Sequence, residues 1–296
     1  MAEPIIIDGK TVSEAIIDRV DAESRALIAE RGITPGLAVV LVGDDPASAT
    51  YVRSKGKMCE RLGFHSVTHK LPADTAEDDL LGLVGMLNVD PAIHGILVQA
   101  PLPGHINYDR IVKAIDYRKD VDGLHPVSVG RMVIGMPALE SCTPAGVIEM
   151  LKYYQIPTDG VRTVIVGRSN LVGKPLANMM MQKRKGGNAI VTVAHSAARD
   201  LKSITREADI LIAAIGRPRY ITADMVKEGA TVIDVGINRV DDAEAKRGYR
   251  LVGDVDYDAV APKCHAITPV PGGVGLMTIA MLMNNTLRSA RGDVGE

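Results

Sequence analysis

A tyrosine and a lysine, Tyr51 and Lys55, lie four residues apart in a segment (46–63) whose pattern predicts a helix. Residues i and i+4 of a helix share a face, so the phenol and the amine project side by side. A lysine that is partly shielded from water has a lowered pKa and can exchange protons near neutral pH. An exposed lysine beside a half-buried tyrosine has the same spacing, and taken alone the pair favours that simpler interpretation.

Polar side chains follow a buried strand further along the chain. Gln99 ends the apolar run 95–99, and the carboxyl ends of strands are where α/β sheets bind ligands. Its carboxamide can both donate to and accept from a heterocycle. Asp120 and Asp122 lie in a turn; most such aspartates bond only their own backbone. Asp122 is also suited to accept two N–H bonds from an aminopyrimidinone edge.

A second candidate site is the segment 163–177, which predicts a strand, a glycine turn and a helix. Gly167 and Gly173 frame the turn, and Pro175 suits an early helical position. Such a turn lets backbone N–H groups approach a pyrophosphate. Ser169 occupies the place of the second glycine of the usual dinucleotide motif, so a purely structural turn is about as compatible with this segment as a cofactor site.

The end of the next strand bears on which dinucleotide would bind. NAD-specific folds commonly place an acid there to bind the ribose 2′-hydroxyl, but this strand ends in His195 and Ser196. Arg168 in the turn and Arg199 beyond the strand are able to neutralise a 2′-phosphate, Arg199 being the weaker candidate. The hypothesis is that NADP is preferred over NAD.

The elements that position these residues form two α/β series. Residues 37–43, 65–71 and 95–99 predict strands that alternate with helices, and a helix opened by a Thr11–Glu14 capping box and ending near Gly32 precedes them. A proline-punctuated region, 100–145, leads to a second series of strands within 163–169, 189–195, 208–216 and 230–237, and to a last helix at 275–291. The rhythm predicts parallel sheets covered by helices on both faces.

Composition excludes several classes of function. A chain of 296 residues favours two domains, and a net charge of -2 with no Trp and one Phe argues against nucleic-acid binding. No apolar run is long enough to span a bilayer, and three widely spaced cysteines indicate reduced thiols in a cytoplasmic protein.

No metal site is expected. Asp254, Asp256 and Asp258 alternate like the start of a calcium-binding loop, but the glycine and the glutamate that such a loop requires are missing. The three aspartates are therefore interpreted as a strand end or turn.

Together these segments resemble a known family, the bifunctional methylenetetrahydrofolate dehydrogenase/methenyltetrahydrofolate cyclohydrolases of the FolD type. The resemblance covers nearly the whole chain, in the family's order. It rests on Tyr51, Val52, Lys55, Lys57 and Cys59, on 95–99 with Pro101-Leu102-Pro103, on 119–123, on Cys142-Thr143-Pro144, on Gly167-Arg168-Ser169 with Val172, Gly173 and Pro175, and on 271–275.

The resemblance implies a fold and an assembly. It implies two α/β domains with a cleft between them: a folate-binding catalytic domain formed by 1–140 plus 275–296, and a Rossmann-like NADP-binding domain formed by 141–274. A homodimer is implied as well. The implied activity is NADP-dependent oxidation of 5,10-methylenetetrahydrofolate to the methenyl form and hydrolysis of that product to 10-formyltetrahydrofolate, a one-carbon interconversion that serves purine biosynthesis.

Residue roles also follow from the resemblance. Lys55 is the implied catalytic lysine, Gln99 its partner, and Tyr51 the residue that orients the folate, while Asp122 anchors the pterin. The loop Pro271, Gly272 and Gly273 is implied in substrate binding. The implied cofactor residues are Gly167, Arg168, Ser169, Gly173, His195, Ser196 and Ile237.

Two other interpretations share parts of this pattern. A two-domain NAD(P) dehydrogenase acting on an amino or keto acid has the same architecture, and a non-enzymatic nucleotide-binding protein would keep the turn at 163–177 without needing Lys55. The combined set of Tyr51, Lys55, Gln99 and Asp122 argues against both.

Overall fold

The chain folds into two compact units, described here from a computed structural model that covers residues 3–242, 244–245 and 248–294. Unit 1 contains residues 1–14 and 143–278, and unit 2 contains residues 15–142 and 279–296. Each unit has its own parallel sheet, which confirms the predicted fold class. The assignment of folate to 1–140 plus 275–296 and of the cofactor to 141–274 stays a prediction, and residues 1–14 group with the larger sheet.

Unit 1 is built on a six-stranded sheet of order β1-β11-β8-β7-β5-β6 in which every neighbouring pair is parallel. All residues of β7 and β8 are buried, as expected for strands covered on both faces. The strands are β1 (Ile5–Ile6), β5 (Arg162–Val166), β6 (Ile190–Ala194), β7 (Ile210–Ala213), β8 (Thr231–Asp234) and β11 (Ala266–Ile267).

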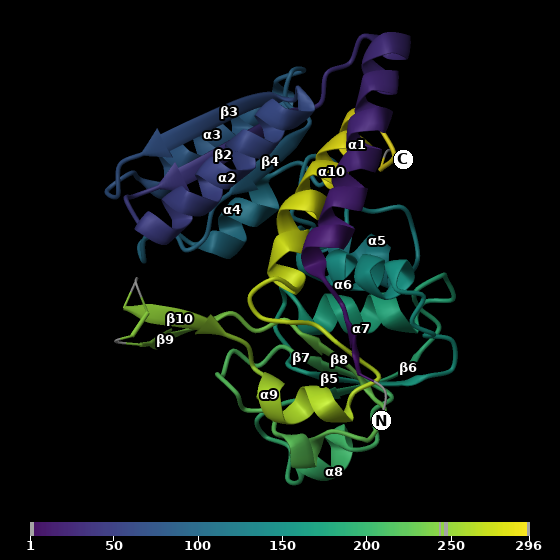
Figure 1. Ribbon diagram of the computed structural model, residues 1–296. Helices are drawn as coiled ribbons and strands as arrows, with labels where there is room; N and C mark the ends of the chain where they lie inside the picture. The colour runs from purple at the N-terminus through teal and green to yellow at the C-terminus, as the bar shows by residue number, and fades with distance from the viewer. Residues whose placement is uncertain (1–2, 243, 246–247, 295–296) are drawn as a thin grey trace. The chain divides into compact units, whose positions relative to one another are not determined.

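Helices cover both faces of this sheet. Figure 1 shows α6 (Cys142–Tyr153) and α7 (Gly173–Met181) on one face, and α8 (Leu201–Thr205) and α9 (Tyr257–Val260) on the other. The second face packs through Leu211, Val232 and Val260. Burying such side chains contributes about 1.5–3 kcal/mol each before the cost of ordering the chain.

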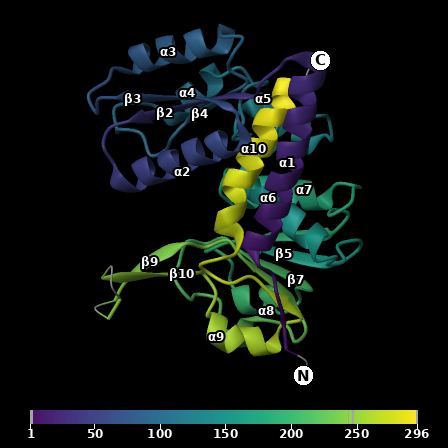
Figure 2. The ribbon, with the colours of Figure 1, turned by 45° about the horizontal axis from the view of Figure 1, so that its top comes forward.

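Unit 2 has a smaller parallel sheet of order β3-β2-β4, with β2 (Gly36–Val42), β3 (His65–Leu71) and β4 (Gly95–Val98). Figure 2 shows α3 (Glu77–Val89) and α4 (Tyr108–Ala114) on one face of this sheet and α2 (Pro46–Leu62) on the other. A short helix, α5 (Pro126–Val133), follows in the proline-punctuated region. Part of α1 (Gly9–Arg31) and most of α10 (Met277–Arg291) complete the unit.

Helix α1 begins earlier than the sequence predicted. It starts at Gly9, and the Asp8 carboxylate accepts hydrogen bonds from the backbone N–H groups of Lys10 and Thr11. Thr11 is therefore inside the first turn, and the expected Thr11–Glu14 capping box is wrong as the start of the helix. An aspartate satisfies the same unpaired N–H groups as a threonine cap, so the two starts are hard to distinguish from sequence.

Two strand pairings were not predicted. The two-residue strand β1 pairs with β11, and β9 (Asn238–Asp241) forms an antiparallel hairpin with β10 (Tyr249–Val252).

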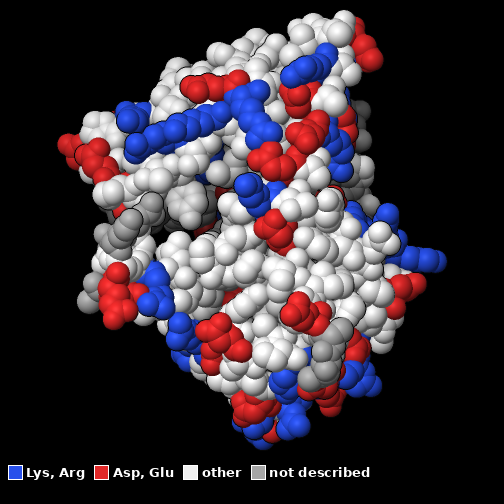
Figure 3. All heavy atoms as spheres, in the orientation of Figure 1, with Lys and Arg blue, Asp and Glu red and all other residues white. Residues whose placement is uncertain are grey.

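On the face drawn in Figure 3, acidic and basic side chains are interspersed, so no region of one sign dominates it. None of the helices in the described ranges combines the length and the apolar character that a membrane crossing requires.

Gly95 at the start of β4 offers a test of how closely the chain packs there. A methyl group added at Gly95 would lie 2.6 Å from Val121 Cγ1, whereas one added at Gly82, on the exposed side of α3, would meet nothing within 4 Å. We expect Gly95→Ala to lower the free energy of unfolding by about 1–3 kcal/mol through overpacking. Gly82→Ala should raise it by up to about 1 kcal/mol. Urea denaturation measures both, and equal effects would contradict the packing described.

Candidate functional site

Lys55 carries a buried amine in unit 2. The residue is 7% exposed, and its Nζ donates a 2.8 Å hydrogen bond to Gln99 Oε1. The Gln99 Nε2 group donates to the carbonyl oxygen of Ala100 at 2.7 Å, which fixes the orientation of the carboxamide with its oxygen toward the amine. Helix α2 and the end of β4 therefore bring together two residues that are 44 positions apart in sequence.

Asp122 is the nearby carboxylate. Burial lowers the pKa of Lys55, and the negative charge of Asp122 partly offsets that effect. Burial likewise raises the pKa of Asp122, and both the Lys55 charge and a hydrogen bond from the Cys142 thiol oppose the rise. The two groups form a pair in which each favours the charged form of the other, inside surroundings that disfavour both charges.

The turn that carries Asp122 is fixed by groups outside it. Asn285 on α10 donates from Nδ2 to the carbonyl oxygens of Val121 (2.9 Å) and Glu140 (2.8 Å). Asp120 is buried, and its Oδ2 accepts from the backbone N–H of His125 at 2.7 Å. Burial raises the pKa of Asp120 to about 7. The backbone of 120–125 is thus held on both sides of Asp122.

Tyr51 differs from Lys55 in its surroundings. The residue is 51% exposed, although it lies one turn before Lys55 on α2. An exposed aromatic ring next to a buried amine offers a flat apolar surface to a ligand. Its role in orienting a substrate stays a prediction.

In unit 1, the glycine turn joins β5 to α7 as expected. Gly167 has φ 142°, and an added methyl there would lie 2.2 Å from the carbonyl oxygen of Ala214, at the end of β7. The space beside Gly173 is equally closed, because a methyl there would lie 2.1 Å from the Gly167 carbonyl oxygen. Ser169 Oγ accepts from Val172 N–H at 3.1 Å. The result is a compact turn with Arg168 and Ser169 exposed at the start of a helix.

The neighbouring strand β6 ends beside this turn, since Gly167 N–H donates to the Ala194 carbonyl oxygen at 2.9 Å. His195 is half-buried and Ser196 and Arg199 are exposed. The first acid after the strand, Asp200, accepts from Ser203 N–H and caps α8. Its carboxylate is therefore engaged, and basic side chains remain next to the turn. These residues fit a dinucleotide that carries a 2′-phosphate.

The remaining predicted residues of unit 1 follow other strands of the same sheet. Ile237 comes after β8, and its Cδ1 would lie 2.8 Å from a methyl added at Gly275. The loop Pro271, Gly272 and Gly273 comes after β11, and the Gly272 carbonyl oxygen accepts from Gly9 N–H at 2.8 Å. Both segments lie on the carboxyl side of parallel strands, the side where α/β sheets bind ligands.

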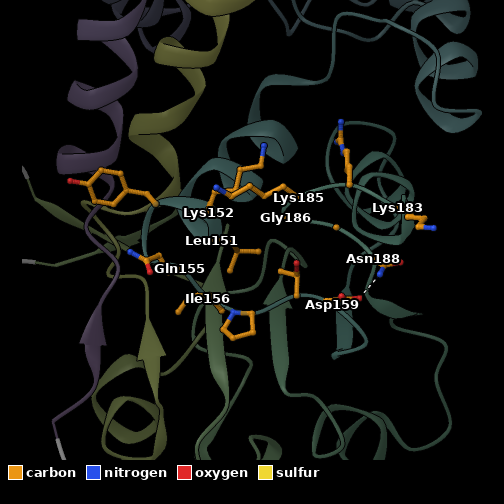
Figure 4. Close-up of a pocket in the computed structure, with 14 residues that line it drawn as sticks. Leu151, Lys152, Gln155, Ile156, Asp159, Lys183, Lys185, Gly186 and Asn188 are labelled. Atoms are coloured by element: carbon orange, nitrogen blue, oxygen red, sulfur yellow. Dashed lines mark hydrogen bonds between the residues drawn. The ribbon is translucent and has the colours of Figure 1, made fainter.

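A cavity of about 770 Å³ in unit 1 lies elsewhere. Figure 4 shows residues from the end of α6 and from the loop before β6 around it, with Asn188 hydrogen-bonded to Asp159. Asp159 and Asn188 precede β5 and β6, so the cavity is at the amino edge of these strands and contains none of the predicted site residues. Within the part of the chain that the structure describes, no three His, Cys, Asp or Glu side chains cluster as metal ligands would.

Sequence reasoning missed two supporting residues, Cys142 and Asn285. Cys142 was interpreted as a reduced thiol and as part of the Cys142-Thr143-Pro144 segment of the resemblance, without a role of its own; it is free and buried, and it bonds Asp122. Asn285 lies 164 positions from Val121, whose carbonyl it binds. No short-range pattern reports such a contact. The one available signal was an amide at position 285, inside the apolar run of the last helix.

Comparison with known proteins identifies the family. The model of the tetrahydrofolate dehydrogenase/cyclohydrolase catalytic domain matches residues 7–122, and that of the NAD(P)-binding domain of the same family matches residues 141–294. The bifunctional protein FolD of Chlorobium phaeobacteroides is 56% identical over 288 residues, which are 97% of this chain and 98% of the relative.

Solved structures agree with these matches. The FolD methylenetetrahydrofolate dehydrogenase/cyclohydrolase of Campylobacter jejuni is 46% identical with a TM-score of 0.91, and 97% of this chain and 98% of that one are covered. The Trypanosoma brucei dehydrogenase-cyclohydrolase, solved with NADP and an inhibitor, is 38% identical with a TM-score of 0.92 over the full length of both. The chain belongs to the tetrahydrofolate dehydrogenase/cyclohydrolase family.

Proposed function

We propose that this chain oxidises 5,10-methylenetetrahydrofolate to 5,10-methenyltetrahydrofolate with NADP and hydrolyses the product to 10-formyltetrahydrofolate. The observation that carries the proposal is the buried Lys55 amine, 2.8 Å from Gln99 Oε1 and next to Asp122, in a chain whose second half matches an NAD(P)-binding domain. The chain is 56% identical to a relative that is named as bifunctional, and this similarity supports both activities.

The dehydrogenase step needs alignment more than acid–base catalysis. Bound NADP would supply the acceptor for the hydride of the methylene bridge, whose loss leaves a delocalised cation on the folate. The exposed backbone around Ser169 would hold the pyrophosphate at the start of α7, and Arg168 would bind the 2′-phosphate. Orientation of the two rings then supplies several kcal/mol of the rate enhancement.

The hydrolysis step needs a base. Water attacks the methenyl carbon, and a proton must leave that water as the carbon–oxygen bond forms. The adduct then opens by cleavage of the bond between this carbon and N5, which keeps the electron pair and takes up a proton, and the formyl group stays on N10. Desolvation lowers the pKa of Lys55 and so raises the fraction of neutral amine available to accept the proton. Gln99 Oε1 accepts from the amine and keeps it oriented during the transfer.

Binding of the pterin is assigned to Asp122 and Tyr51. The Asp122 carboxylate is able to accept two N–H bonds from the aminopyrimidinone edge, and the exposed Tyr51 ring offers a face for stacking. The loop Pro271, Gly272 and Gly273 is proposed as a further part of the substrate site. The chain is also proposed to act as a cytoplasmic homodimer, an inference that rests on the family resemblance.

The direct test is an assay of the purified protein with methylenetetrahydrofolate and NADP, in which NADPH and methenyl absorbance are followed separately. Lys55→Met should reduce methenyl hydrolysis at least about 100-fold, because the proton acceptor is lost. Dehydrogenase activity should fall less. Lys113→Met, at an exposed position of α4, is the matched control and should leave both activities unchanged. Full hydrolysis by Lys55→Met would exclude the proposed base.

The charge of Asp122 should be visible in the titration of Lys55. Asp122 raises the pKa of the amine, so Asp122→Asn should lower that pKa further and move the neutral form to lower pH. NMR of ¹³C-methylated lysines measures the shift. Asp79→Asn, a substitution at an exposed position of α3, should leave the pKa of Lys55 unchanged. An unchanged or raised pKa in Asp122→Asn would contradict the pairing of the two groups.

Arg168 should determine the preference for NADP. Arg168→Ala should lower kcat/KM for NADP about tenfold and leave kcat/KM for NAD nearly unchanged, because only NADP carries the 2′-phosphate. Arg162→Ala removes an exposed arginine from the other end of β5 and serves as the control. Equal losses with both dinucleotides would assign Arg168 to a structural role.

A further inference from the structure

Asp254 is a completely buried carboxylate that receives hydrogen bonds from three consecutive backbone amides. Its Oδ2 accepts from Ile215 N–H (2.6 Å) and Gly216 N–H (2.9 Å), and its Oδ1 accepts from Arg217 N–H at 2.9 Å. Oδ1 also accepts from Asn238 Nδ2 at 2.9 Å. Neither the predicted active site nor the predicted cofactor residues include it.

The groups that Asp254 binds belong to two loops on the carboxyl side of the sheet. Residues 215–217 follow β7, and Asn238 follows β8 and begins β9. Asp254 therefore ties together the loops after two adjacent strands. Three successive amides directed at one point form an anion-binding turn, and here its anion is a side chain of the protein itself.

The first of these loops touches the glycine turn. Ala214 immediately precedes the bonded residues, and its carbonyl oxygen would lie 2.2 Å from a methyl added at Gly167. Ala214 N–H also donates to the Val166 carbonyl oxygen at 2.9 Å. A shift of 215–217 is thus transmitted through Ala214 to the backbone that is proposed to hold the pyrophosphate.

The place of Asp254 is itself fixed. Asp234, at the end of β8, accepts from Asp254 N–H and Val255 N–H, each at 2.9 Å. Two glycines leave room for these carboxylates. A methyl group added at Gly236 would lie 2.2 Å from Asp254 Oδ1, and one added at Gly253 would lie 1.9 Å from Asp234 Oδ2, so both would clash. The two buried aspartates and the two glycines leave Asp254 one position.

We propose that Asp254 is a positioning residue for the dinucleotide: by holding the loops after β7 and β8 it sets the shape of the turn at Gly167 and hence the affinity for NADP. This inference rests on the proposed function. It assigns to Asp254 no contact with cofactor or substrate, and it separates the two activities, because hydrolysis uses Lys55, Gln99 and Asp122 of unit 2 and no dinucleotide.

The test compares cofactor and hydrolysis kinetics in single variants. In Asp254→Asn, one oxygen becomes an NH₂ group that faces backbone N–H donors, so KM for NADP should rise about ten- to a hundredfold. The KM for methenyltetrahydrofolate and the rate of its hydrolysis should remain as in the wild type. Asp258→Asn removes the same charge from an exposed position four residues later and should change neither activity.

A second, milder variant keeps the inference testable if Asp254→Asn does not fold. Asn238→Ala removes one of the four hydrogen bonds and should raise KM for NADP about threefold, with calorimetric NADP titration as an independent readout. An unchanged NADP affinity in a folded Asp254→Asn protein would overturn the inference, as would an unchanged affinity in Asn238→Ala if Asp254→Asn does not fold. Wild-type protein without NADP-dependent activity would instead refute the proposed function.

Discussion

The amine of Lys55 is kept out of water, and the architecture of unit 2 is organised around that constraint. An unpaired buried charge costs several kcal/mol, so the amine needs an acceptor and a counter-charge close by. Gln99 Oε1 at the end of β4 provides the first, and Asp122 in the turn after α4 provides the second. Gln99 is positioned by the sheet register, since β2 pairs with β4 through residues 37–40 and 95–98, and the turn of Asp122 is joined to β4 by the bridge between Ile96 and Asp120.

Unit 1 solves a different problem, namely how to hold irregular backbone at the carboxyl edge of a sheet. Apolar packing positions the strands, but loops need partners for their N–H and C=O groups. Buried carboxylates supply acceptors for the N–H groups here: Asp254 accepts from three amides after β7, and Asp234 accepts from the backbone N–H of Asp254. The fixed loops in turn support the glycine turn through Ala214 and Gly167.

Regular elements were predictable because their signals are local. The apolar strand 36–42 and the glycine turn at 167–173 lie within a residue or two of where their patterns placed them. Strand β1 escaped notice, because two exposed isoleucines form a strand only when β11 is beside them. The roles of Asp254 and Asn285 were missed for the same reason. The Arg217 amide that Asp254 binds is 37 positions away, the Val121 carbonyl that Asn285 binds is 164 positions away, and neither contact leaves a periodic trace in the sequence.

The interleaving of the two units in sequence bears on how the chain is assembled during synthesis. Strand β1 at residues 5–6 must wait for residues 266–267 before its edge of the sheet can close. Unit 2 in turn lacks Asn285, and with it the bonds to Val121 and Glu140, until α10 has left the ribosome. Nascent chains therefore expose two incomplete cores at once, and both reach their final form only after β11 and α10 have been synthesised.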